Sequence, residues 1–225
     1  MSKTKILHYG LHRSGTNFLQ ALLTHNFYIE IINPTRGGSV ESVCHKHARL
    51  YDDNDSVSGR FKAHSIKNFK DLSVRIKECN KFPHFFVVLS KDPYSWFLSH
   101  KAHAQDYGEY LNIKNHPIKE YNLYYKKLIS LSEEGGNFLF VRYVDLISSV
   151  DELVRLSELM SLKKKTNEIT HNKEKVPHSR HFSEDRRRYY MDKLYLSEYK
   201  KEDFKEINDN LEGEVVEYLG YSIIE

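Results

Sequence analysis

A continuous apolar run near the middle of the chain limits most strongly how the protein can fold. The segment 84-HFFVVLS-90 shows no alternation of polar and apolar side chains, so a strand formed here has to be covered on both faces. Strands of this kind belong to parallel sheets that carry helices on each side. The run therefore predicts a central strand of a parallel sheet.

Further strand and helix patterns alternate along the chain. Strands are expected at 5–9, 28–32, 60–65 and 138–143, and helices at 16–25, 68–79, 93–103, 118–131, 149–160 and 195–219. The alternation predicts an α/β fold with three layers and a mostly parallel central sheet. Ligands of such sheets bind beyond the carboxyl ends of the strands. Polar stretches follow three predicted strands, after Tyr9, after Ser90 and at Arg142.

The size and charge of the chain exclude several classes of protein. Its 225 residues suit a single domain over 1–225, in which the polar and basic segment 163–188 is the predicted lid. A net charge of +3, from 34 basic and 31 acidic residues, is too small to predict a nucleic-acid partner. No apolar run approaches the length of a membrane-spanning helix. Cys44 and Cys79 lie far apart and outside any CxxC motif, which predicts a reduced, cytoplasmic protein.

The stretch 10-GLHRSGTNFL-19 joins the first predicted strand to the first predicted helix. Backbone N–H groups at a helix N-terminus attract anions, and Gly10 and Gly15 allow the backbone to wrap closely around one. Arg13 adds a forked cation suited to phosphate or sulfate oxygens. Three further donors share the loop: Ser14, Thr16 and Asn17. A nucleoside triphosphatase would carry a lysine directly after the second glycine. That lysine is missing, so the loop is either an anion site of another kind or a plain turn with a surface arginine.

This loop resembles the 5′-phosphosulfate loop of sulfotransferases, which use 3′-phosphoadenosine-5′-phosphosulfate (PAPS). A second family signature is a strand followed by Arg-x-Pro and a serine eight residues after the arginine. The segment 86-FVVLSKDPYSWFLS-99 has Lys91, Pro93 and Ser99 at those positions. Lys91 replaces the commoner arginine, so it would bind phosphate as a point charge without the bidentate fork. The stretches 141-VRYVDL-146 and 218-YLGYS-222 also resemble family segments, so the resemblance spans nearly the whole chain.

The resemblance, which is nearest to bacterial carbohydrate sulfotransferase-like proteins, implies a fold and a reaction. The fold is the sulfotransferase variant of the P-loop nucleoside-triphosphatase fold. The reaction moves a sulfuryl group from PAPS to an acceptor hydroxyl, with no metal required. The implied acceptor is a carbohydrate or a glycolipid, the latter through transient contact with a membrane. The residues that it implies for PAPS binding are His12, Arg13, Ser14, Gly15, Thr16, Asn17, Lys91, Ser99, Arg186 and Arg187.

Arg186 and Arg187 enter this set through the basic segment 180-RHFSEDRRRYY-190. In the sulfotransferase family a late basic loop closes over adenosine bisphosphate, and these arginines match its place in the chain. An equally good interpretation is the charged start of a helix, with the arginines paired to Glu184 and Asp185.

Two Lys/His pairs lie between the two anion motifs. Lys46-His47 resembles the WKH-type segment of the bacterial proteins, and Lys62 with His64 resembles the KTH of cytosolic sulfotransferases. The resemblance implies that a histidine removes the acceptor proton and a lysine assists the bridging oxygen. The two pairs remain alternatives. The predicted catalytic residues are therefore Arg13, Lys46, His47, Lys62 and His64.

Other interpretations stay open at this point. If neither histidine is the base, Asp52 or Glu41 would serve. The chain would be a P-loop nucleotide kinase if its loop bound ATP, although the missing lysine argues against this. It would be a non-catalytic nucleotide-binding module if the chemistry had been lost, which Lys91 in place of arginine and His45 in place of tryptophan allow.

The chain contains thirteen histidines, which raises the question of a metal site. His45 and His47 are two apart, and His100 and His103 are three apart on a predicted helix. No Cys/His set has zinc-finger spacing. Solvated or cofactor-lining roles are therefore favoured over metal binding.

Overall fold

The computed structural model describes residues 3–33, 42–51, 63–79, 82–107, 116–171 and 183–224. These residues contain a parallel sheet of four strands, β1 (Thr4–Tyr9), β2 (Ile29–Ile31), β3 (Phe85–Ser90) and β4 (Phe138–Arg142). The strand order is β2-β1-β3-β4, and every neighbouring pair is parallel. Its register sets His8 beside Val87 and Val88 beside Phe140. The prediction of an α/β fold with a parallel sheet is confirmed.

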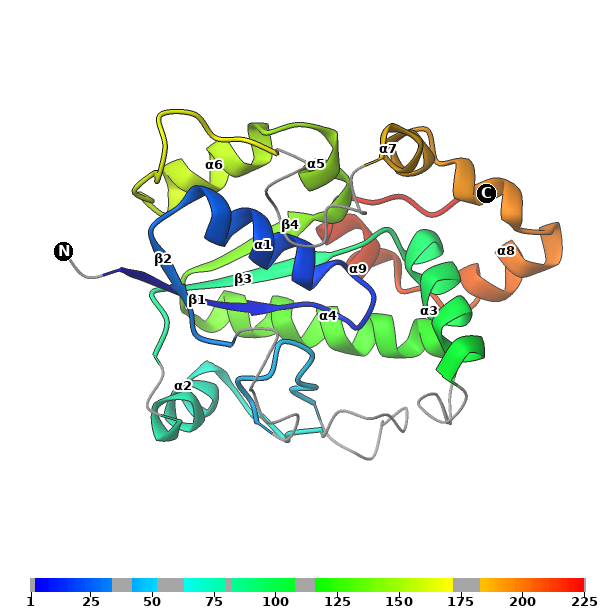
Figure 1. Cartoon of the computed structure of the whole chain (residues 1–225). Coiled ribbons are helices and arrows are strands. Elements are labelled where there is room, and N and C mark those ends of the chain that lie inside the picture. The colour runs from blue at the N-terminus through cyan, green and yellow to red at the C-terminus, as the bar shows by residue number, and fades with distance from the viewer. Residues whose placement is uncertain are drawn as a thin grey trace.

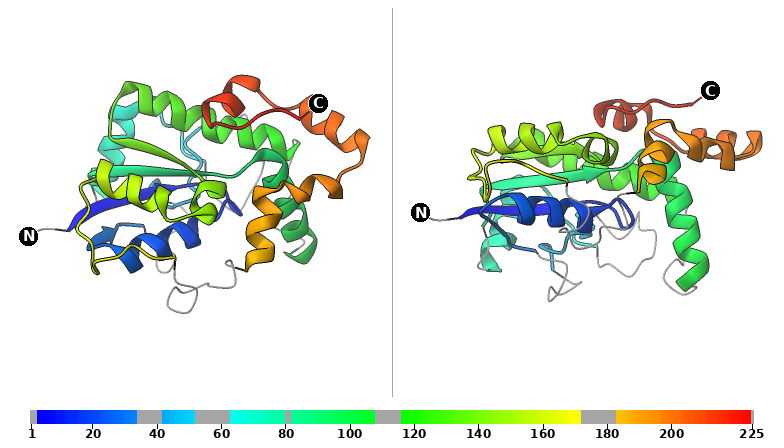
Figure 2. Two further views of the ribbon diagram at one scale, coloured as in Figure 1. Left: turned by 90° about the horizontal axis from the view of Figure 1, so that it is seen from above. Right: turned by 45° about the horizontal axis from the view of Figure 1, so that its top comes forward.

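Helices cover both faces of this sheet and complete three layers. In Figure 1, α1 (Thr16–Asn26) and α6 (Asp151–Leu159) lie above the sheet, while α2 (Phe69–Glu78) and α4 (Pro117–Glu134) lie below it. The other described helices are α3 (Pro93–Tyr107), α5 (Tyr143–Ser148), α7 (Glu184–Met191), the 3₁₀ helix η4 (Leu194–Glu198), α8 (Lys201–Asn208) and α9 (Gly213–Tyr218). The two further views in Figure 2 show α7, α3 and α8 together at the end of the sheet opposite the N-terminus.

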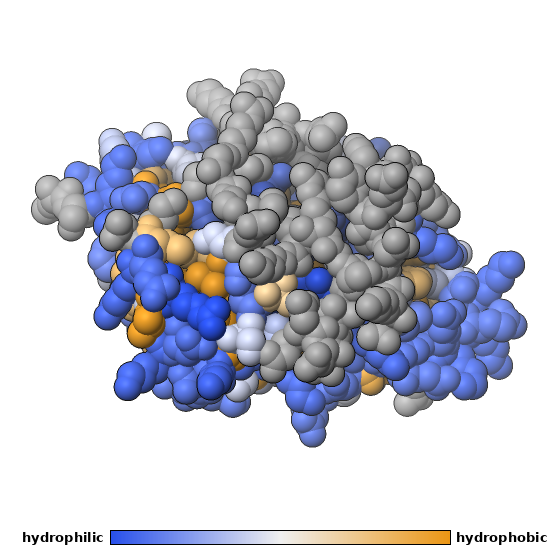
Figure 3. Space-filling model, turned by 90° about the horizontal axis from the view of Figure 1, so that it is seen from below, coloured by the Kyte–Doolittle hydropathy of each residue, from blue (hydrophilic) through white to orange (hydrophobic). Residues whose placement is uncertain are grey.

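The apolar run 84–90 forms the centre of the core. In β3, Val87, Val88 and Leu89 are fully buried, because β1 and β4 flank the strand and helices cover both its faces. The surface seen from below is largely hydrophilic over the described residues, with apolar residues showing only in small areas (Figure 3). Among the described helices, none is both long and apolar enough to cross a membrane.

The structure corrects several element boundaries. Strand β4 ends at Arg142 and α5 begins at once with Tyr143, a helix that the sequence did not predict. Of the expected strand at 60–65, only 63–65 is described, and it shows a single bridge between Arg49 and Ala63. The region 195–219 divides into η4, α8 and α9. Of the predicted lid, 163–171 and 183–188 are described; the part between them lies outside the described residues.

Helix α4 ties the strand ends to each other through a row of tyrosine hydroxyls. The hydroxyl of Tyr121 donates to the Lys91 carbonyl at 2.8 Å, and that of Tyr125 donates to the Leu89 carbonyl at 2.9 Å. The hydroxyl of Tyr124 lies 3.4 Å from the Lys46 carbonyl. All three side chains are buried. The turn after β3 and the segment around Lys46 are therefore positioned by the same helix.

Gly15 offers a test of how tightly the first loop is built. Its φ is +99°, and a Cβ added there would lie 2.6 Å from the Tyr143 ring. Gly15→Ala should lower the free energy of unfolding, measured in urea, by about 2 kcal/mol or more, because left-handed backbone strain adds to the clash. The matched control is Gly213→Ala, where the nearest atom would be Ile223 Cδ1 at 4.0 Å. The control should stay within about 0.5 kcal/mol of the wild type. Equal effects would contradict this description of the loop.

Candidate functional site

The loop after β1 forms a compact turn at the N-terminus of α1. The Ser14 amide donates to the Leu11 carbonyl at 3.0 Å, and Arg13 and Gly15 both have positive φ angles, 72° and 99°. Ser14 is buried, whereas Arg13 is exposed at the tip of the turn. The positive end of the α1 dipole and its first N–H groups meet at this turn. The loop therefore has the geometry of an anion site, with a guanidinium beside it.

The loop is packed directly against the end of β3. A Cβ on Gly10 would lie 2.8 Å from the Leu89 carbonyl oxygen and 2.6 Å from the Ser14 hydroxyl. Only glycine allows this close approach. The carboxyl ends of β1 and β3 thus present the first loop and the segment after Ser90 side by side, as the sequence predicted for neighbouring parallel strands.

The side chain of Lys91 lies at the end of β3 and is almost entirely buried, with 3% of the residue exposed. Its Nζ donates to Ser99 Oγ at 2.6 Å and to the Tyr190 hydroxyl at 2.9 Å. Lys91 and Ser99, which lie eight residues apart in the chain, therefore meet. The sequence did not predict Tyr190, which α7 brings to the ammonium from ninety-nine residues away. Nothing in the local pattern of α7 indicated this contact.

Two arginines, Arg186 and Arg13, add positive charge near the Lys91 ammonium. Burial lowers the pKa of Lys91, and the nearby Arg186 and Arg13 lower it further, while Tyr190 opposes the shift. Burial alone would raise the pKa of Tyr190, but Lys91 and Arg186 outweigh it and lower that pKa. Among the described residues, hydroxyl groups rather than carboxylates hold the ammonium. Such a concentration of positive charge is suited to a bound anion.

The two arginines of α7 have different surroundings. Arg186 lies over the Tyr190 ring, with its guanidinium carbon 5.7 Å from the ring centre, and its electrostatic partners are Tyr143 and Tyr190. Arg187 forms an ion pair with Glu184, with 3.8 Å between Nη1 and Oε2. The charged-helix interpretation thus describes Arg187, whereas Arg186 belongs to the group around Lys91.

The pair Lys46 and His47 lies against the first loop. The Gly10 amide donates to the Lys46 carbonyl at 3.0 Å, and Lys46 Nζ donates to the Asn17 side-chain oxygen. His47 Nδ1 donates to the Gly10 carbonyl at 2.6 Å. Because a carbonyl only accepts, Nδ1 carries the proton, and the neutral ring has its lone pair on Nε2. Burial lowers the pKa of His47 well below its ordinary value, so the ring is neutral at pH 7.

His64, from the second Lys/His pair, lies beside the same segment. Its amide donates to the Arg49 carbonyl at 2.7 Å, and the Arg49–Ala63 bridge adjoins this bond. Lys62, Glu41 and Asp52 lie outside the described residues. The structure therefore brings His47 to the loop, while His64 lies beside Arg49, two residues after His47.

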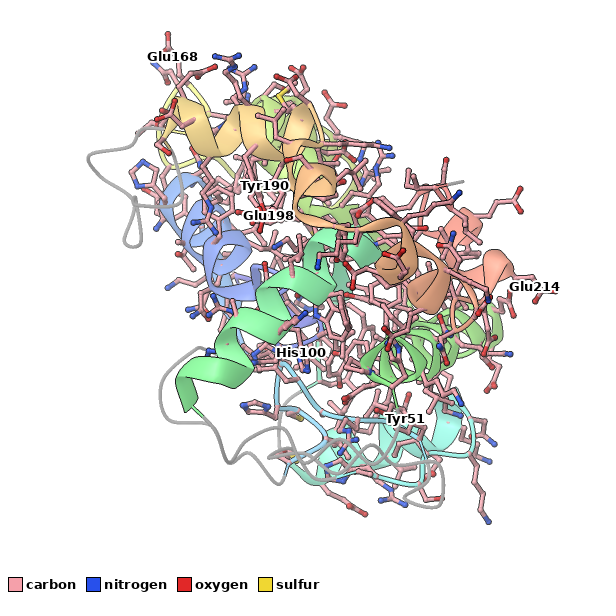
Figure 4. All side chains as sticks on the ribbon, turned by 90° about the vertical axis from the view of Figure 1, so that its right-hand side faces the viewer. Tyr51, His100, Glu168, Tyr190, Glu198 and Glu214 are labelled. Atoms are coloured by element: carbon pink, nitrogen blue, oxygen red, sulfur yellow. The ribbon has the colours of Figure 1, made fainter. Side chains whose placement is uncertain are left out.

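A buried ion pair anchors that segment to α4. Arg49 Nε lies 2.9 Å from Glu120 Oε1 and donates to the Tyr51 hydroxyl at 3.0 Å. Burial raises the pKa of Glu120, although Arg49 opposes the shift. Figure 4 shows Tyr51, His100 and Tyr190 along one side of the molecule, with Tyr190 toward α7 and Tyr51 on the far side of α3. Sequence reasoning missed Arg49 and Glu120, because the partners are far apart in the chain.

The remaining predicted ligand-binding features can now be placed. Arg142, at the end of β4, is bound to Asp145 at 2.7 Å and to the Gly220 carbonyl at 2.7 Å, so it links the helix α5 to the C-terminal segment.

A cavity of about 300 Å³ lies between α5, α6 and α7, bounded by Ile147, His171 and Arg187. Within the described part of the chain, no group of three or more His, Cys, Asp and Glu side chains could hold a metal ion.

The chain was compared with protein-family models, with curated proteins and with solved structures. No protein-family model matches the chain, and no curated protein matches it. Among solved structures, it is similar to mouse sulfotransferase SULT7A1 complexed with PAP, with a TM-score of 0.45 and 13% sequence identity. The match covers 93% of this chain and 84% of that one.

The pKa of Lys46 gives a pH-dependent prediction. Burial lowers it from 10.5 to about 8. Above about pH 8 the unfolded chain therefore keeps a proton that the folded state has lost, and stability rises with pH. The free energy of unfolding of the wild type, minus that of Lys46→Met, should increase from about pH 7 to about pH 9.5 in urea titrations. A flat or falling difference would show that Lys46 is not buried as a charged group.

Proposed function

We propose that the protein is a sulfotransferase that moves a sulfuryl group from PAPS to a hydroxyl of an acceptor. The observation that carries the proposal is the buried ammonium of Lys91, held by Ser99 and Tyr190 beside Arg186 and next to the loop that carries Arg13. There are thus two cationic sites at neighbouring strand ends, one at Lys91 and one at Arg13. They suit a nucleotide with anionic groups at both its 3′ and 5′ positions. ATP carries all its phosphates on the 5′ position, so it would leave the site at Lys91 without an anion.

The residues present fit such a donor. An ammonium has three donors, and Lys91 gives two of them to hydroxyl groups, so the third can reach a 3′-phosphate. Ser99 and Arg186 would bind the same group. The 5′-phosphosulfate would lie at the N-terminus of α1. The loop residues that would contact it are His12, Arg13, Ser14, Gly15, Thr16 and Asn17.

The chemistry needs a proton acceptor and stabilisation of the leaving oxygen. We assign the first role to His47, because the ring is neutral and its Nδ1–H bond to Gly10 fixes it beside the loop with the Nε2 lone pair as the base. Lys46, held by Asn17, and Arg13 would stabilise the charge that develops on the bridging oxygen. His64 with Lys62 is the alternative pair. The donor supplies the sulfuryl group, and the scheme needs no metal ion.

The acceptor class rests on the resemblance rather than on the geometry. A carbohydrate hydroxyl is the proposed acceptor, either free or on a glycolipid that the enzyme contacts transiently at a membrane. The cytoplasmic location is proposed from the two cysteines, Cys44 and Cys79, which lie far apart in the chain and outside any CxxC motif.

Calorimetry with adenosine 3′,5′-bisphosphate (PAP), ATP and ADP tests the donor assignment. The wild type should bind PAP tightly and the other two weakly. Lys91→Met should weaken PAP binding by roughly tenfold or more, because the charge-assisted bonds to the 3′-phosphate are lost. The control is Lys163→Met, which removes a lysine that lies over the Tyr28 ring. Tyr28 follows the C-terminal end of α1, whereas the loop lies at its N-terminus, so this variant should bind PAP normally. Preference for ATP over PAP would overturn the proposal.

Single-turnover measurements on His47→Ala and His64→Ala test the base. With radiolabelled PAPS, and water as the acceptor, His47→Ala should release sulfate roughly a hundredfold more slowly than the wild type. Its affinity for PAP should not change, and His64→Ala should remain close to the wild type. Loss of activity in His64→Ala alone would transfer the role to His64. Normal rates in both variants would exclude a histidine base.

A further inference from the structure

His100 is a buried histidine whose burial has no evident structural benefit. It lies on α3, 5% exposed, with its ring stacked on Trp96 at a centroid distance of 4.9 Å and an angle of 28°. Within the described part of the chain, neither of its ring nitrogens has a hydrogen-bond partner. A buried polar group without a partner costs about 1–3 kcal/mol. A phenylalanine would keep the stacking and avoid this cost.

The surroundings of His100 connect it to the first loop. Trp96, on which it stacks, donates from Nε1 to the His12 carbonyl at 2.9 Å. Arg13 and His103 are its electrostatic neighbours, and together with burial, the largest cause, they lower its pKa to about 4. The rings of His12 and His103 are themselves 4.6 Å apart. The His100 imidazole is therefore neutral, keeps one N–H, and is held beside the exposed tip of the loop.

His100 is separated from the Lys91 group although it follows Ser99 in the chain. Successive residues on an α-helix point about 100° apart. Ser99 points toward Lys91, whereas His100 stacks on Trp96, one turn earlier on the same helix. Arg13 and His103 are the charged groups that act on His100, and Lys91 is not among them. An anion that His100 contacts would thus be the one at Arg13 and not the one at Lys91.

We infer that His100 belongs to the binding site for the sulfuryl end of the donor, where its ring N–H donates to an oxygen of the group that Arg13 binds. This inference rests on the proposed function. A neutral hydrogen-bond donor suits the sulfuryl group, because this group is transferred to the acceptor. The donor orients the sulfuryl oxygens without adding a further positive charge that would slow release of the sulfated product. The cost of the unpartnered ring in the unliganded protein is recovered when the ligand supplies the missing partner.

The test compares PAPS with PAP, which lacks the sulfuryl group, by calorimetry in the absence of an acceptor. His100→Phe should bind PAP within about twofold of the wild type and bind PAPS roughly tenfold more weakly or worse. Its melting temperature without ligand should equal or exceed that of the wild type, because two unpartnered buried nitrogens are removed. His25→Phe, in the last turn of α1 far from the loop, is the matched control and should bind both ligands normally.

The outcomes separate this inference from the proposed function. If the wild type does not bind PAP, the proposed function fails and the inference with it. If the wild type binds both ligands and His100→Phe binds PAPS normally, or loses affinity for both equally, the inference on His100 is overturned while the proposed function stands. His100→Gln keeps an N–H donor, folds with a side chain of similar length, and should retain more PAPS affinity than His100→Phe. Equal losses in the two variants would assign the effect to packing and overturn the inference.

Discussion

The buried ammonium of Lys91 is the interaction on which the arrangement of the site depends. A charged group taken out of water has to be surrounded by hydrogen-bond partners, or it costs several kcal/mol. In this protein the partners are the hydroxyls of Ser99 and Tyr190. Hydroxyls satisfy the ammonium without neutralising it, so its positive charge remains available. In the proposed function, that charge binds the 3′-phosphate of the donor.

Helix α4 is what makes this arrangement rigid. Its tyrosines bind backbone carbonyls at the end of β3 and next to Lys46, and Glu120 binds Arg49. These contacts join the turn that carries Lys91 to the segment that carries His47. The segment around His47 is also bound to the first loop through the amide and the carbonyl of Gly10. The site is thus assembled from connecting segments, and α4 holds two of them in place.

The electrostatics of the site divide it into a charged part and a neutral part. Burial lowers the pKa of Lys91, and the nearby cations Arg186 and Arg13 lower it further. His47 and His100 are kept neutral by burial. In the proposed reaction the cations would bind the anionic groups of the donor, with Lys91 and Arg186 at the 3′-phosphate and Arg13 at the phosphosulfate. The neutral imidazoles would donate to a sulfuryl oxygen, at His100, and take the proton of the acceptor, at His47. Burial separates these roles, because desolvation opposes protonation of an imidazole that lacks an acidic partner.

The sequence by itself determined the parallel sheet and singled out the pair Lys91 and Ser99. The run 84–90 predicted the buried strand β3, because a continuous apolar stretch has to be covered on both faces. The family signature picked out Lys91 and Ser99, which a hydrogen bond joins in the structure. Only the tertiary structure decided that Tyr190 reaches Lys91, that Arg49 pairs with Glu120, and that His47 contacts the loop. It also showed helix α5 starting directly at the end of β4. Such contacts join residues far apart in the chain, and they follow from how the layers pack rather than from the preferences of any one segment.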